Sequence, residues 1–120
     1  MIRMICSFAV LAVATPASAE TLMLASTYDE VGTNADGSKY TGTVDVDVIS
    51  NTTFKIRWKI GSTVYSGFGM RMNDTLAATY TVNGEPGLII YKVGDDGVLS
   101  GIWSIRGQNG SGTDRLIPRK

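Results

Sequence analysis

From about residue 23 onward, the sequence alternates short runs rich in Val, Ile, Thr and Tyr with clusters of Gly, Asn and Asp. No run keeps the i, i+3, i+4 apolar spacing of a helix, whereas the composition and length of the runs are typical of strands. Eight strands are predicted, over residues 23–32, 39–49, 53–61, 63–71, 74–82, 87–93, 98–105 and 112–118. The chain is therefore predicted to be all-β.

The connections between these segments are short, which determines how the strands pair. Asp-Gly or Asn-Gly pairs at residues 36–37, 83–84 and 96–97 supply the positive φ angles that tight hairpins need. A parallel crossover needs a dozen or more residues, so consecutive strands must be antiparallel. We expect residues 20–120 to form one up-and-down, calycin-like antiparallel barrel of about eight strands, because closure removes exposed edges. A two-sheet sandwich is the alternative.

One predicted hairpin carries alternating charge. Residues 44–49 read VDVDVI and residues 54–60 read FKIRWKI. Matching the apolar faces places Val48 opposite Phe54, Val46 opposite Ile56, Val44 opposite Trp58, Asp47 opposite Lys55 and Asp45 opposite Arg57. The basic row of Lys55, Arg57 and Lys59 then serves mainly register and solubility. The alternative is that this row is a surface for recognising a partner.

The N-terminal segment, residues 1–19, has the pattern of a secretory signal peptide. Arg3 gives a positive start, residues 4–14 are apolar, and Ala17-Ser18-Ala19 forms a cleavage site after Pro16. The apolar run is too short to span a bilayer as a helix. We therefore expect an exported protein, periplasmic or extracellular, without an integral membrane segment after cleavage.

The residue inventory excludes several kinds of chemistry. The sequence has no His, and its one Cys, Cys6, lies in the predicted signal peptide. Thiol nucleophiles, Ser-His-Asp triads and the usual zinc sites therefore cannot be built. Eleven basic and eleven acidic residues leave a net charge near zero, so nothing predicts binding to nucleic acid. We expect no enzyme activity, cofactor or metal site.

Aromatic residues and glycines recur together. The segments YTGTV, YSGFG and LSGIW, which begin at Tyr40, Tyr65 and Leu99, share a large residue two positions before a Gly. The two residues lie on one face, so the side chain is predicted to cover the glycine, and the glycine to allow bending. Tyr40, Trp58, Tyr65 and Trp103 are predicted on the inner face. An eight-stranded interior is barely wide enough for side chains, so we expect a packed core, with a ligand pocket as the alternative.

Four stretches, GTNADGSKYTGTV, FKIRWKIGSTVYSGFGM, IIYKVGDDGVLSGIW and GTDRLIP, span most of residues 32–117. Together they resemble a group of small exported bacterial barrel-like proteins, some of which are labelled fibronectin-binding. The resemblance rests on glycines and aromatics and carries no assigned binding residue. Two positions depart from the group's pattern, since Phe54 stands where Tyr is usual and Asp114 where Glu is usual.

From these patterns we expect a non-enzymatic binding protein. The first hypothesis is a protein-interaction module, toward a partner outside the cytoplasm such as a fibronectin-type matrix protein, as the resemblance implies. The second is a small-molecule carrier of lipocalin-like or avidin-like type that uses the aromatic set. The third is an inhibitor of a foreign hydrolase such as lysozyme.

Overall fold

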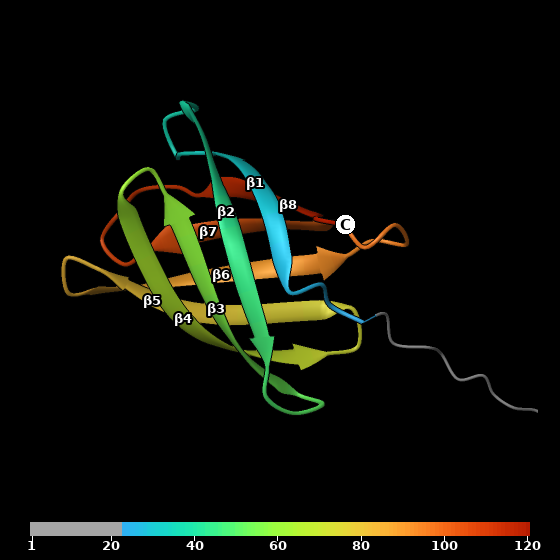
Figure 1. Ribbon diagram of the computed structural model, residues 1–120. Helices are drawn as coiled ribbons and strands as arrows, with labels where there is room; N and C mark the ends of the chain where they lie inside the picture. The colour runs from blue at the N-terminus through green and yellow to red at the C-terminus, as the bar shows by residue number, and fades with distance from the viewer. Residues whose placement is uncertain (1–22) are drawn as a thin grey trace, which may run out of the picture.

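The computed structural model describes residues 23–120 as a closed barrel of eight antiparallel strands. The strands are β1 (Thr27–Thr33), β2 (Lys39–Val48), β3 (Thr53–Ile60), β4 (Thr63–Met72), β5 (Thr75–Val82), β6 (Glu85–Val93), β7 (Leu99–Ile105) and β8 (Gly112–Pro118). They follow one another around the wall in chain order, and β1 pairs with β8 to close it (Figure 1). The predicted barrel is confirmed. The predicted signal peptide lies outside the described residues.

The strand boundaries differ from the predicted ones mainly at β1 and β6. β1 begins at Thr27, because the preceding residues run as coil and the Ala25 N–H donates a hydrogen bond to the Tyr28 hydroxyl. β6 begins at Glu85, because Asn83 and Gly84 alone make the turn, with φ angles of 50° and 81°. Two consecutive positive φ angles form the tight hairpin in which pairing resumes at once.

The charged hairpin has the predicted register. β2 and β3 pair Val44 with Trp58, Asp45 with Arg57 and Val46 with Ile56. In Figure 1 these strands lie in the near wall and cross β6 and β7 at a steep angle. The inward row is buried as far as Val46, but Val48 lies at the end of the barrel and is 55% exposed.

Five large inward rings each lie opposite a glycine of a neighbouring strand. Tyr40 faces Gly32, Phe54 faces Gly69, Tyr80 faces Gly87, Tyr91 faces Gly101 and Trp103 faces Gly112. A β-carbon at Gly32 would lie 2.3 Å from Tyr40 Cζ, and one at Gly69 would lie 2.3 Å from Phe54 Cζ. The expected covering of a glycine by its own strand is therefore wrong, because side chains stand across the sheet and reach the neighbouring strand first.

The outer wall differs between its two sides. β2 and β3 carry charges outward, whereas β4, β6 and β7 expose large apolar side chains. These are Val64, Phe68, Met70, Met72, Leu88, Ile90 and Ile102. Met70, Ala77, Ile90 and Ile102 are neighbours in one row across four strands. No helix among residues 23–120 is long and apolar enough to cross a membrane.

Candidate functional site

One end of the barrel contains a cavity of about 570 Å³. Its rim includes residues 34–36 of the β1–β2 hairpin and Gln108 and Asn109 of the β7–β8 connection. The inward aliphatic side chains Ile60, Val82 and Ile105 line it at strand ends. A volume of this size is within the range of small-molecule sites in proteins. We call this half the open end, and the opposite half, built on Phe54, Leu76, Leu99 and Leu116, the packed end.

Five aromatic side chains form the walls of the cavity. All four residues of the predicted aromatic set, Tyr40, Trp58, Tyr65 and Trp103, line it together with Tyr80. The Tyr40 and Trp103 rings meet edge to face at 6.2 Å, and the Trp58 and Tyr80 rings do so at 5.3 Å. The interior is therefore packed at one end only, and the rings expected to fill it surround a space instead.

Hydrogen bonds fix the orientation of these rings. Tyr40 Oη and Trp103 Nε1 both donate to the Thr113 carbonyl oxygen, at 3.1 and 3.2 Å. Tyr80 Oη donates to the Ser104 carbonyl oxygen at 3.4 Å. Because their polar atoms are hydrogen-bonded to the wall and the rings lie close to glycines, these side chains present apolar surface to the cavity. Such a preformed wall reduces the entropy cost of binding a ligand.

Two buried carboxyl groups reach the inner end of the cavity. Glu30 on β1 is 2% exposed and Asp114 on β8 is 3% exposed, and both line the cavity. β1 and β8 are paired, with Gly32 opposite Asp114 and Leu116 opposite Glu30, so the two acids are diagonal neighbours on the inner face. Within the described residues, Glu30 Oε1 is a buried side-chain atom with no hydrogen-bond partner.

Two tyrosine hydroxyls lie within hydrogen-bond distance of Asp114. Tyr91 Oη donates to Asp114 Oδ2 at 2.5 Å, and Tyr40 Oη also lies within hydrogen-bond distance of Asp114 Oδ1, at 3.2 Å. Trp58 Nε1 donates to Tyr91 Oη at 2.9 Å, so a chain of donors runs from Trp58 to the carboxylate. These donors stabilise a negative charge at Asp114 without a positively charged partner.

The environment shifts the protonation of both acids. Burial raises the pKa of Glu30 to about 10, with the neighbouring Asp114 carboxyl adding to the shift. Burial also raises the pKa of Asp114, although hydrogen bonds from the side chains around it oppose that shift. At neutral pH Glu30 therefore holds a proton, and the pair carries at most one negative charge. Burial and Asp114 likewise raise the pKa of Tyr80 to about 12.

Sequence reasoning missed Glu30, Asp114, Tyr80 and Tyr91. Glu30 alternates with Tyr28 and Gly32, and Asp114 alternates with Gly112 and Leu116. This alternation places both acids on inward faces, and it is the sequence signal from which their burial could have been predicted. Their proximity could be inferred only after pairing the first strand with the last. The described residues contain no cluster of three or more acids, His or Cys that could hold a metal ion.

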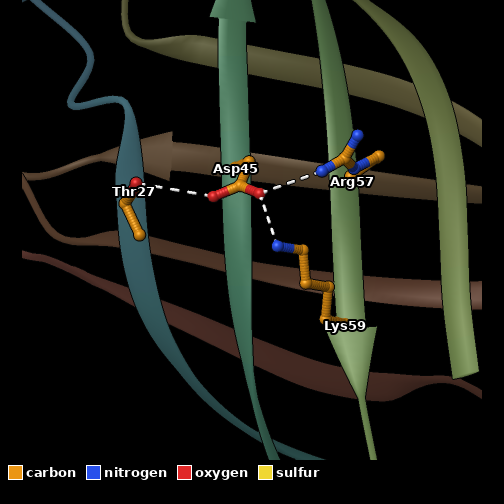
Figure 2. Close-up of polar contacts among 4 residues, drawn as sticks. All are labelled: Thr27, Asp45, Arg57 and Lys59. Atoms are coloured by element: carbon orange, nitrogen blue, oxygen red, sulfur yellow. Dashed lines mark hydrogen bonds and ion pairs between the residues drawn. The ribbon is translucent and has the colours of Figure 1, made fainter. Parts of the chain in front are cut away.

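The basic row lies on the outer wall, on the opposite face of β3 from the cavity-lining Trp58 and Ile60. Asp45 lies between Lys59 Nζ, at 2.9 Å, and Arg57 Nη2, at 3.3 Å, and Thr27 Oγ1 also donates to it (Figure 2). The Arg57 and Lys59 side chains remain 54% and 41% exposed. The predicted role of these charges in pairing β2 with β3 thus agrees with the contacts of Asp45. Lys55 lies opposite Asp47, as predicted.

Comparison with known proteins bears on the fold. No family model and no curated protein matches the sequence. Among solved structures, the chain is similar to a redesigned β-barrel, mFAP1, bound to DFHBI, with a TM-score of 0.62 and 20% identity. The match covers 78% of this chain and 94% of that barrel. At this identity the likeness supports the barrel fold. The resemblance to exported fibronectin-binding proteins stays a prediction.

Proposed function

We propose that this protein binds a small molecule in the cavity at its open end. The observation that carries the proposal is the cavity itself: about 570 Å³, with five aromatic rings and two buried carboxyl groups around it. A mostly apolar cavity with a few converging polar groups is the usual form of a small-molecule site.

Two further features support this proposal. Burying two acids, one of them with an unpartnered oxygen, lowers the stability of the fold. A bound ligand that donates a hydrogen bond to that oxygen would offset part of this cost. The similar barrel mFAP1 is bound to DFHBI in its structure, so a ligand-bound barrel of this fold has a precedent. We further propose that this chain is a non-catalytic carrier that works outside the cytoplasm, as its predicted signal peptide indicates.

The test uses the two tryptophans, both of which line the cavity. The protein, labelled with ¹⁵N, is titrated with 2-naphthalenemethanol, a neutral aromatic probe, and the indole N–H signals of Trp58 and Trp103 are followed by NMR. We expect both signals to move and to saturate together. Unchanged indole signals at probe concentrations near its solubility would contradict the proposal.

A pair of variants on one strand provides the control. Val82 on β5 lines the cavity, and its neighbour Thr81 is exposed on the outer wall. Val82→Phe fills part of the cavity and should weaken probe binding several-fold, whereas Thr81→Phe adds the same ring outside and should leave binding unchanged. Equal effects of both variants would place the probe elsewhere.

A second candidate function is protein interaction through the basic row of Lys55, Arg57 and Lys59. The observation in its favour is that these side chains point outward along one strand, with Arg57 and Lys59 about half exposed. Reversing all three charges should weaken binding to a fibronectin-type partner and reduce its salt dependence. Unchanged affinity in the folded triple variant would exclude this surface. Inhibition of a foreign hydrolase stays a prediction that an activity assay would test.

A further inference from the structure

The charges around the cavity are all of one sign. Glu30, Asp36 and Asp114 line it, and no Lys or Arg of residues 23–120 is among the lining side chains. Asp36 lies at the rim, where the Ser38 hydroxyl and backbone N–H hydrogen-bond to it and lower its pKa, so it is ionised at neutral pH. An anionic ligand would be repelled by this set.

The inner end of the cavity offers hydrogen-bond acceptors and lacks a counter-charge. The Tyr91 hydroxyl donates to Asp114, and Tyr40 Oη also lies within hydrogen-bond distance of it, so the carboxylate is stabilised by neutral donors alone. Glu30 Oε1 is buried in the cavity lining and has no partner in the described part of the chain. A β-carbon at Gly42 would lie only 3.0 Å from this oxygen, so the glycine leaves room for the carboxyl. A donor from a ligand would satisfy Oε1, and a positive one would also neutralise Asp114.

The aromatic walls of the cavity also favour a positively charged group. Tyr40 with Trp103 and Trp58 with Tyr80 form two edge-to-face pairs beside the acids. The face of an aromatic ring carries negative potential, so rings around a site attract a cation that has lost part of its water. Aromatic walls also accept the apolar body of a ligand.

We propose that the cavity selects organic cations, with an ammonium or amidinium group at Glu30 and Asp114 and an aromatic or aliphatic body between the rings. This inference rests on the proposed small-molecule function and assigns it a ligand class. It differs from that function in requiring the two carboxyl groups, and not only the space, for binding.

The test compares three probes that share one ring system and differ in charge. They are 2-naphthylmethylamine, which is a cation at neutral pH, the neutral 2-naphthalenemethanol, and the anion 2-naphthoate. Isothermal titration calorimetry at pH 7 and low salt gives the three affinities. We expect the amine to bind at least about tenfold more tightly than the alcohol, which corresponds to one buried charge interaction of modest strength. The carboxylate should bind most weakly.

Variants test whether the preference for the amine over the alcohol comes from Glu30 and Asp114. In the double variant Glu30→Gln with Asp114→Asn, which keeps shape and removes charge, the amine should lose its advantage while the alcohol still binds. Should the double variant fail to fold, Asp114→Asn alone, which removes the one negative charge of the pair, is measured and should reduce the preference. Asp47→Asn removes an exposed carboxyl of the outer wall and should leave the preference intact.

The possible outcomes separate this inference from the proposed function. If the alcohol binds as tightly as the amine, the cation inference is overturned while the small-molecule function stands. If the amine stays preferred in the folded double variant, the assignment to Glu30 and Asp114 is overturned. If none of the three probes binds, both proposals fail.

Discussion

Both ends of this barrel are formed by strands with alternating inward and outward residues, but different kinds of inward side chain occupy the two ends. At the packed end, inward positions carry Phe54, Leu76, Leu99 and Leu116, each no more than 1% exposed. At the open end, inward positions carry Tyr40, Tyr65, Tyr80 and Trp103, which are only partly buried. Between the two lies the layer of Glu30 and Asp114.

The difference shows how a small barrel can hold both a core and a site. Apolar side chains that meet across the barrel fill the packed end and supply most of the burial. At the open end Tyr40, Tyr80 and Trp103 each lie against a glycine of the neighbouring strand and hydrogen-bond to a backbone carbonyl oxygen, which keeps these rings at the wall. We therefore expect substitutions to affect stability at one end and binding at the other.

The largest effect should follow from Phe54→Ala at the packed end. The ring is 1% exposed and lies over Gly69, so its removal leaves a cavity and should cost about 3–5 kcal/mol of unfolding free energy. Urea denaturation measures the change. Tyr65→Ala at the open end is the matched comparison and should cost less than half as much while weakening probe binding. Equal costs at both ends would contradict the division between them.

A smaller, pH-dependent effect should follow from Glu30→Gln. The unfolded chain releases the Glu30 proton near pH 4.5, whereas the folded protein holds it until about pH 10. Deprotonation therefore favours the unfolded state between these values, and the unfolding free energy of the wild type should fall as pH rises through this range. Glutamine removes this penalty.

The measurement is the unfolding free energy of both proteins from pH 5 to pH 8.5. We expect the variant to be the more stable at pH 8, with its advantage shrinking toward pH 5. Asp29→Asn, which removes an exposed carboxyl on the same strand, is the control and should not reproduce this pH dependence. A difference that does not change with pH would contradict the buried, protonated state of Glu30.

The smallest effect should follow from Asp45→Asn on the outer wall. Lys59 first, and Arg57 with it, lowers the pKa of Asp45, so its ion pairs stabilise the fold above the unfolded value of 3.8 and are lost as pH falls below it. Because these side chains are a third to a half exposed, the contribution is about 0.2–1 kcal/mol at pH 7 and weakens with salt. A loss of several kcal/mol would show that the outer charges matter as much as the core.

The barrel could be predicted from sequence because each strand and turn carries a local signal. Alternation in residues 44–60 gave the β2–β3 register, and short Asn-Gly and Asp-Gly turns gave the antiparallel order. The aromatic lining could also be predicted, since Tyr40, Trp58, Tyr65 and Trp103 lie on inward faces. Closure then brings them to one end.

The acids and the open space could not be predicted in the same way. Glu30 and Asp114 belong to the first and last strands, so their proximity depends on closure of the barrel. Whether rings meet across the centre or lie against the wall depends on which glycine stands opposite each ring. Sequence spacing within one strand does not contain that information, and it suggested the wrong glycine partners.

The central claim is that a small molecule enters the open end, and intermolecular NOEs test it most directly. With methyl-labelled Ile, Leu and Val and 2-naphthylmethylamine as the probe, we predict NOEs to Ile60, Val82 and Ile105, which line the cavity. Leu76, Leu99 and Leu116 of the packed end should show none. NOEs to Leu88, Ile90 and Ile102 on the exposed outer wall, without NOEs to the cavity, would contradict the account.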